Sequence, residues 1–241
     1  MRKIATITVV LTLLVLLAMP SKASPLVFED EKGDVADILT QSNISKSGTD
    51  IKRLIYYQYD SGKVIVSLEV YGEIDPHTYY TVALTTTEGN KKIGYAIAYL
   101  KSEEIAKNLG VNETVNKVLA VENESFNKTI SLDHKFEIIN KDTLRVTFNL
   151  LSPGESIREI AVMTWGLEWN QGLNGWFPRY MDFLNCTVEQ SQPQQTDNEN
   201  QTQQSNNENQ QDNKGSPGFE AILLLPAILI ALLILRNKKN L

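Results

Sequence analysis

Residues 63–73 read KVIVSLEVYGE, and their alternation of apolar and polar side chains decides the expected fold class. The apolar side of this run is formed by Val64, Val66, Leu68 and Val70, and the polar side by Lys63, Ser67 and Glu69. Successive side chains of a strand point to opposite faces, so a period of two predicts a strand with one buried face.

The same pattern recurs along the chain, with turn-forming residues between the runs. Residues 143–150, TLRVTFNL, place Leu144, Val146, Phe148 and Leu150 on the buried side. The turn sequences are YDSGKV at 59–64, INKDTL at 139–144 and SPGES at 152–156. The expected strands span residues 51–59, 63–73, 136–139, 143–150 and 157–165, and a further pair is joined at residues 88–90.

One short helix is expected at residues 102–109. Ser102 is a suitable N-cap, two glutamates follow it at the positive end of the helix dipole, and Gly110 is a suitable terminator. Eight or nine strands with a single small helix predict a mainly β fold, namely one antiparallel β-sandwich over residues 24–188.

The N-terminal 23 residues have the three-part plan of a secretory signal peptide. Arg2 and Lys3 precede an apolar run over residues 4–19, and Ser21 and Ala23 occupy the small positions before a cut ahead of Ser24. An uncleaved N-terminal anchor is the alternative, although the run is short for a membrane span.

After the expected sandwich, residues 189–216 contain no Val, Ile, Leu, Met or aromatic residue. Such a segment buries too little apolar area to offset ordering entropy, so we expect a disordered Gln/Asn-rich stalk. Residues 221–235 are apolar and span roughly 25 Å as a helix, which is slightly short for a hydrocarbon core. Arg236, Lys238 and Lys239 then place the sandwich outside the cell by the positive-inside rule.

Residues 217–241 resemble the PGF-type sorting tail of archaeal surface proteins. Pro217, Gly218 and Phe219 form the tripeptide, followed by the apolar helix and a basic end. The resemblance implies that an archaeosortase-type membrane protease removes the tail and that the mature protein stays lipid-anchored. Pro226 within the helix departs from the pattern, and a permanent transmembrane anchor is the alternative.

Behind a signal peptide, each Asn-x-Ser/Thr triplet is a candidate glycan acceptor. The six candidates are Asn43, Asn112, Asn123, Asn127, Asn185 and Asn200. The single cysteine, Cys186, cannot form an intrachain disulfide, so we expect an idle thiol, with a link between two chains as the alternative.

The most distinctive stretch is MTWGLEWNQGLNGWFPRYMDF, residues 163–183, which holds all three tryptophans of the chain. We expect Trp165 to end a strand and to pack in the core. Trp169 and Trp176 fall in the expected loop after it, where with Asn170 and Arg179 they are candidates for binding a sugar or a protein. The alternative is that all three rings close one end of the core.

The first residues of the expected sandwich are acidic, with Glu29, Asp30, Glu31, Asp34 and Asp37 close together. Calcium favours oxygen-rich turns, but the spacing is not that of an EF-hand loop. A solvated acidic turn without a metal is the favoured interpretation, and calcium binding stays open.

No catalytic motif is evident in the expected sandwich. His77 and His134 lack the spacing of zinc ligands, and neither a G-x-S-x-G element nor a phosphate-binding loop is present. The chain carries 29 acidic against 23 basic residues, a net charge of −6, without a basic stripe, which disfavours nucleic acid as a partner. We therefore expect a non-enzyme without a cofactor.

Residues 29–35 and 50–74 resemble, more weakly, the opening of DOMON-like and family-9 carbohydrate-binding sandwiches. That resemblance implies ligand binding, with sugar as the leading class. The sequence thus favours a glycosylated sandwich on the extracellular face of the cell membrane that binds a polysaccharide or a surface-layer protein. A purely structural envelope protein and a tethered hydrolase with a carboxylate pair are the alternatives.

Overall fold

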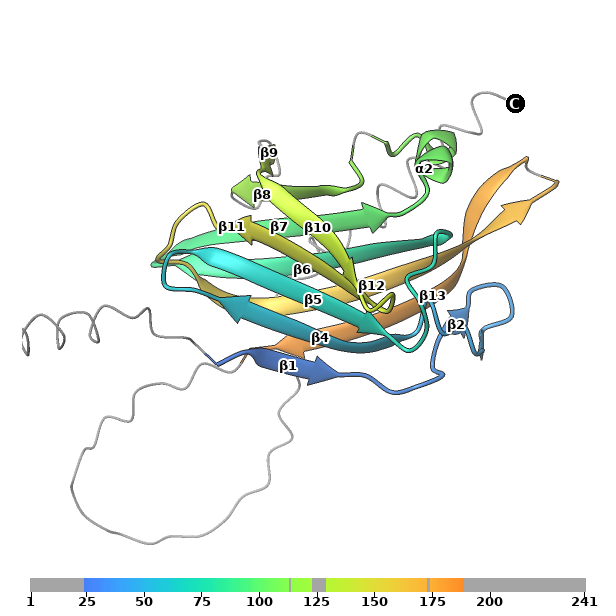
Figure 1. Ribbon diagram of the computed structural model, residues 1–241, viewed down its shortest axis with the longest axis horizontal. Coiled ribbons are helices and arrows are strands. Elements are labelled where there is room, and N and C mark those ends of the chain that lie inside the picture. The colour runs from blue at the N-terminus through green and yellow to red at the C-terminus, as the bar shows by residue number, and fades with distance from the viewer. Residues whose placement is uncertain (1–23, 113, 123–128, 173, 189–241) are drawn as a thin grey trace, which may run out of the picture.

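The computed structural model describes residues 24–112, 114–122, 129–172 and 174–188, which form a mainly β fold of two antiparallel sheets (Figure 1). The expected signal peptide, stalk and sorting tail lie outside these residues. Within the described residues, no helix has the length and apolar character needed to cross a membrane. The predicted antiparallel β-sandwich is confirmed.

The first sheet contains five strands in the order β1-β4-β5-β11-β10. Their bounds are Leu26–Glu29 for β1, Ile51–Gln58 for β4, Lys63–Val70 for β5, Thr143–Asn149 for β11 and His134–Ile139 for β10. Strand β5, which carries the alternation that predicts the fold, lies at the centre of this sheet.

The second sheet contains eight strands in the order β3-β2-β13-β12-β6-β7-β8-β9. Their bounds are Ser42–Asn43 (β3), Ala36–Asp37 (β2), Gly175–Thr187 (β13), Ser156–Asn170 (β12), Thr78–Glu88 (β6), Lys91–Leu100 (β7), Lys117–Glu122 (β8) and Thr129–Leu132 (β9). The described residues thus form more strands than the eight or nine expected, because two-residue strands such as β2 and β3 carry no periodic signal of their own.

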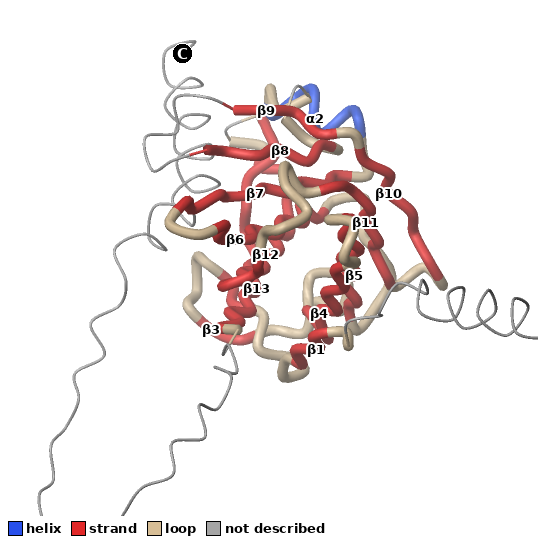
Figure 2. Tube along the Cα trace, turned by 90° about the vertical axis from the view of Figure 1, so that its left-hand side faces the viewer, coloured by secondary structure: helices blue, strands red, loops and turns tan. Residues whose placement is uncertain are grey.

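The two sheets face each other across one continuous apolar core (Figure 2). Val64, Val66, Leu68 and Val70 of β5 are at most 1% exposed, and the apolar residues of β11, together with Leu150 just beyond it, are at most 7% exposed. Cross-strand pairing aligns these rows, since Val66 pairs with Val146, and Val146 pairs with Phe136 of β10. The predicted buried faces are therefore confirmed.

The expected helix is α2, Glu103–Leu109, and its capping is as predicted. The Ser102 side chain accepts a hydrogen bond from the Ile105 N–H at 3.3 Å, and Gly110 ends the helix with a φ of 71°. The helix covers a second, smaller apolar cluster that includes Tyr79, Leu100 and Leu167. This cluster lies beside the β12–β13 hairpin, the longest hairpin of the described residues.

Candidate functional site

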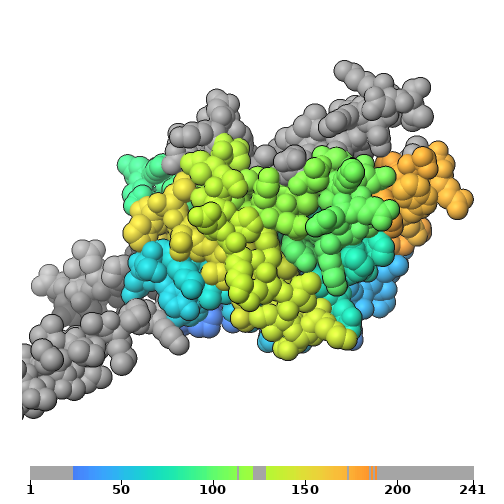
Figure 3. Space-filling model, turned by 45° about the horizontal axis from the view of Figure 1, so that its top comes forward, coloured from blue at the N-terminus to red at the C-terminus, as the bar shows by residue number. Residues whose placement is uncertain are grey.

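The tip of the β12–β13 hairpin carries two of the three tryptophans. Trp169 and Trp176 are direct cross-strand partners, and their rings meet edge to face with centroids 5.9 Å apart. Sequence analysis expects both in a loop, but they lie in strands, because β12 continues to Asn170 and β13 begins at Gly175. The tip protrudes at the edge of the molecule, beside the surface of α2 (Figure 3).

The inner ring of the pair has firm support. Trp176 is half-buried and stacks on the His77 ring at 5.1 Å with an interplanar angle of 27°. His77 is held in turn by Asp75, whose Oδ1 lies 3.1 Å from the His77 Nδ1 and accepts the His77 backbone N–H at 2.7 Å. Trp169, 41% exposed, therefore rests on a supported ring rather than on a mobile loop.

The third tryptophan lies within β12, which continues to Asn170, rather than at the expected end of a strand. Trp165 is half-buried against the cluster under α2. Its Nε1 is shielded from solvent and has no hydrogen-bond partner among the described residues. Trp165 thus contributes to packing, whereas Trp169 offers its ring to solvent.

The structure does not gather all four candidate ligand residues in one place. Arg179 forms ion pairs with Glu168 and with Asp37, and its guanidinium lies 5.4 Å from the Tyr180 ring centre. Glu168 directly precedes Trp169 in β12 and Asn170 directly follows it, so strand alternation places both on the face opposite the ring pair. The exposed aromatic surface is therefore formed by Trp169 and Trp176, without Arg179.

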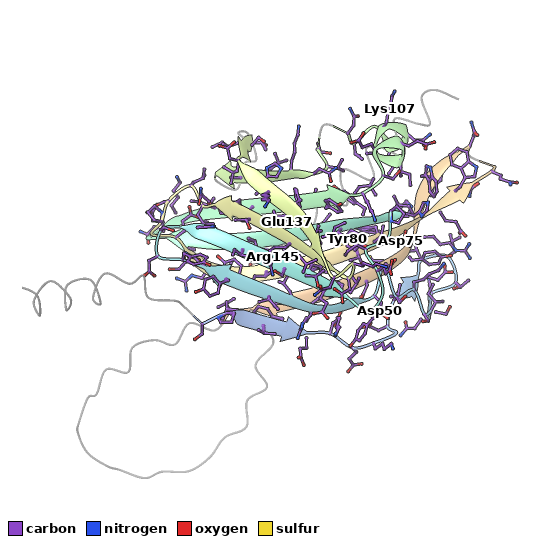
Figure 4. All side chains as sticks on the ribbon, in the orientation of Figure 1. Asp50, Asp75, Tyr80, Lys107, Glu137 and Arg145 are labelled. Carbon is purple, nitrogen blue, oxygen red and sulfur yellow. The ribbon has the colours of Figure 1, made fainter. Side chains whose placement is uncertain are left out.

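A second group of functional side chains lies where the N-terminal segment passes the end of the sandwich. Asp30 follows β1, Asp34 lies in the next turn, and Asp182 comes from β13; each has a carboxylate oxygen within 4.8 Å of one from the other two. Asp50, just before β4, accepts the Gly33 N–H at 2.9 Å and therefore faces the same turn (Figure 4). Three carboxylates from two segments of the chain thus converge, and that of Asp50, from a third segment, lies beside their turn.

Burial and the charges of neighbouring carboxylates raise the pKa values of Asp30, Asp50 and Asp182. Burial, followed by the charge of Asp34, raises the pKa of Asp30 to about 6. Burial also raises the pKa of Asp182 to about 7, with smaller effects from Asp30 and Asp34, and it raises the pKa of Asp50. Such shifts show that the charged forms of these carboxylates lack compensation in the folded protein.

The remaining acids of the N-terminal run have other positions. Glu29 and Glu31 are exposed. Asp37 is buried, and its Oδ1 accepts the Leu39 and Thr40 N–H groups while Oδ2 pairs with Arg179. The expected solvated turn therefore describes the two glutamates, whereas Asp30 and Asp34 turn inward.

The sequence contains a signal for Asp182 that periodicity alone can reveal. In β13, Asp182, Leu184 and Cys186 alternate on the inward face and are all buried. An aspartate at an inward strand position requires either donors or a counter-charge. No comparable local signal marks Asp50, which reaches the cluster through the fold.

Another buried acid, Glu155, is 2% exposed and lies in the loop before β12. The Tyr95 hydroxyl lies within 2.8 Å of both carboxylate oxygens, the Ser152 N–H donates to Oε1, and the Thr86 hydroxyl donates to Oε2. Glu155 also lines a cavity of about 380 Å³ between Ser24 and Val188. Its carboxylate is thus fully engaged within the protein.

The other candidate positions are distributed over the surface and interior. Asn43 on β3 and Asn112 after α2 are exposed, Asn185 pairs through its backbone with Ala161, and Asn123, Asn127 and Asn200 lie outside the described residues. Cys186 is 3% exposed and burial raises its thiol pKa to about 12, which suits the expected idle thiol. Both His134 ring nitrogens lie within 2.8 Å of backbone carbonyl oxygens, which suits a structural role.

Comparison with known proteins gives no relative from which a role can be transferred. No protein-family model matches the sequence, and no curated protein matches it. The function must therefore be argued from the two sites themselves.

Proposed function

We propose that this protein is a non-catalytic module on the extracellular face of the cell membrane that binds a carbohydrate through the β12–β13 hairpin. The observation that carries the proposal is the exposed Trp169 ring, which meets Trp176 edge to face while Trp176 stacks on His77. Large amphipathic rings held rigidly at a surface lose little conformational entropy when a ligand binds.

The chemistry of the tip suits a sugar ring. A pyranose has an apolar face of C–H groups and a polar rim of hydroxyls, so it pairs with an aromatic face flanked by hydrogen-bonding groups. His77 and Asp75 lie next to Trp176 and supply such groups, with side chains about half exposed. This arrangement replaces the expected pairing of the tryptophans with Arg179.

The location of the protein is proposed from the ends of the sequence. Residues 1–23 have the plan of a signal peptide, and residues 217–241 resemble a PGF-type sorting tail. The partners are therefore the membrane, an archaeosortase-type processing enzyme, and a polysaccharide or surface-layer protein. Mass spectrometry of the membrane-extracted protein tests this part, because the mature chain should end near Gly218. Recovery of residues 221–236 in the bulk of that protein contradicts processing.

The buried acids favour binding over hydrolysis. A tethered hydrolase needs two carboxylates that reach a substrate in a cleft. Oxygens of Asp30 and Asp34 are shielded from solvent, and the Glu155 carboxylate is engaged by Tyr95, Thr86 and Ser152. None of these groups is free to approach a glycosidic bond.

Carbohydrate binding is tested with the detergent-solubilised full chain on a glycan array and in polysaccharide pull-downs. Trp169→Ala should lower affinity roughly tenfold or more, as expected for an aromatic anchor. Phe183→Ala is the matched control, because Phe183 is similarly exposed at 37% but lies elsewhere on β13. Absence of binding by the parent, or equal losses in both variants, overturns the proposal. Stoichiometric crosslinking to surface-layer protein in cells would then favour the structural alternative.

A further inference from the structure

We propose that Asp30, Asp34 and Asp182, backed by Asp50, form a calcium site that fastens the N-terminal segment to the end of the sandwich. The site is separate from the tryptophan hairpin and does not depend on carbohydrate binding. It joins three parts of the chain, namely the turn after β1, the residue before β4 and the inward face of β13.

Unsatisfied oxygens carry the inference. Asp30 Oδ2, Asp34 Oδ1 and Asp50 Oδ1 are all shielded from solvent and have no hydrogen-bond partner within the described part of the chain. Asp50 is 1% exposed, and its other oxygen accepts the Gly33 N–H in the turn that carries Asp34. A buried anionic oxygen without a donor or cation is strongly unfavourable, so these oxygens point to a missing positive charge.

Side chains of the described residues supply little of that charge. Among the ion pairs of the described residues, none involves Asp30, Asp34, Asp50 or Asp182. The Lys52 ammonium binds Glu69 instead, and the Lys32 ammonium lies 5.5 Å from the Tyr71 ring centre, although its charge partly lowers the pKa of Asp50. Little positive charge from the described side chains therefore balances the negative charge of these four carboxylates.

Surrounding hydrogen bonds hold the carboxylates in place, as the outer contacts of a metal site do. Asp182 Oδ2 accepts the Ile51 N–H at 2.6 Å, and Asp182 Oδ1 accepts the Phe183 N–H at 2.8 Å. Asp30 is fixed through its backbone, since its N–H donates to Lys52 O and its carbonyl accepts the Tyr71 hydroxyl, both at 3.0 Å. Each oxygen of Asp182 keeps a lone pair for a cation.

The donor set favours calcium over other divalent cations. All converging groups are carboxylates, whereas zinc prefers histidine nitrogen and cysteine sulfur. Calcium accepts irregular sets of six to eight oxygens, and magnesium requires near-octahedral geometry with several waters. Carboxylates drawn from separate segments in an irregular arrangement fit the more flexible ion.

The test measures thermal unfolding of the detergent-solubilised full chain in chelator and after addition of Ca²⁺ or Mg²⁺. Millimolar Ca²⁺ should raise the unfolding midpoint of the parent by about 5 °C, because an ion that binds only the folded state stabilises it. Isothermal titration should give one Ca²⁺ per chain. Asp34→Asn should abolish both responses, while Glu31→Gln should keep them. Glu31→Gln is the matched control: it removes one negative charge from the same turn, but the Glu31 side chain is exposed.

Folding of Asp34→Asn is checked in chelator, where its midpoint should equal or exceed that of the parent. A Ca²⁺ response of Asp34→Asn equal to that of the parent overturns the site. An equal response of the parent to Mg²⁺ overturns the assignment to calcium. If Ca²⁺ does not raise the unfolding midpoint of the parent and only acid does, the carboxylates are stabilised by protons rather than by a cation. That result also overturns the proposal. Because no sugar is involved, failure here leaves the proposed function untouched.

Discussion

Glu155 and the aspartate cluster are both buried acids at loops of the same sandwich, yet their surroundings differ. Glu155 has donors for both carboxylate oxygens, from Tyr95, Thr86 and Ser152. In the cluster, one oxygen each of Asp30, Asp34 and Asp50 has no hydrogen-bond partner among the residues that the structure describes. The first site is complete within the protein, whereas the second requires something from outside.

The difference shows how burial alone misleads as a sign of function. A buried carboxylate surrounded by hydroxyl and N–H donors stabilises the loop that contains it. Carboxylates that face one another raise each other's pKa and weaken the fold unless a cation or protons join them. Structural and ligand-binding acids are thus distinguished by their donors rather than by exposure.

The largest expected effect comes from destroying the complete site. Glu155→Ala removes the carboxylate that accepts hydrogen bonds from the Tyr95 and Thr86 hydroxyls and the Ser152 N–H, and should cost about 3–5 kcal/mol of unfolding free energy. Urea denaturation measures this loss. Glu88→Ala is the control, because the hydrogen bond that Glu88 accepts from the Ser152 hydroxyl is exposed to solvent. This variant should change the unfolding free energy by less than about 0.5 kcal/mol. A loss below about 1 kcal/mol for Glu155→Ala contradicts the comparison.

The next effect is the pH dependence of the metal-free protein. The raised pKa values of Asp30, about 6, and Asp182, about 7, mean that the folded state binds more protons than the unfolded state between about pH 4 and pH 7. The stability contributed by these two protonated groups should therefore be fully present below about pH 4 and be lost as pH rises through 6 and 7. The charged and titratable groups around the cluster are Glu29, Glu31, Lys32, Asp34, Asp50, Lys52, Tyr71 and Cys186.

Thermal melts in chelator from pH 5 to pH 8 measure this slope. Asp182→Asn is less suitable as a probe, because Asp182 also accepts two backbone N–H groups. If the unfolding midpoint of the parent does not change with pH, the negative charge of the cluster is already balanced by another group of the protein.

A smaller effect follows from relieving repulsion within the incomplete site. In chelator at pH 8, Asp34→Asn should raise the unfolding free energy by about 1 kcal/mol, because it removes one of the converging charges. Glu31→Gln, on the exposed side of the turn, should change it by less than about 0.5 kcal/mol. Urea denaturation of the three proteins checks the difference. Destabilisation by Asp34→Asn in chelator would mean that Asp34 is already paired.

The smallest effect on stability is expected for the exposed Trp169 ring at the hairpin tip. Trp169→Ala removes an exposed ring, so it should alter the unfolding free energy by less than about 1 kcal/mol while reducing sugar binding. Trp176→Ala should cost more, about 2 kcal/mol, since Trp176 packs on His77 and on the cluster under α2. Denaturation and sugar-binding assays on both variants distinguish the two roles. A ring that binds sugar affects mainly affinity, whereas a structural ring affects mainly the unfolding free energy.

The sequence by itself determined the elements whose signals lie within a few residues. Alternation over residues 63–70 and 143–150 predicted two central strands and their buried faces, and Ser102 and Gly110 predicted both ends of α2. These features depend on neighbours along the chain, so a single sequence contains them. The hairpin tip was missed because glycines such as Gly172 and Gly175 are typical of loops, whereas the strands continue to Trp169 and Trp176.

The tertiary structure alone decided which side chains meet. The hydrogen bond between the Ile51 N–H and Asp182 joins residues 131 positions apart, and cross-strand register pairs Trp169 with Trp176 while Arg179 joins Glu168 and Asp37. The acidic run near the N-terminus thus supplied only part of the cluster. Register and sheet order depend on packing of the whole core, which local patterns do not specify.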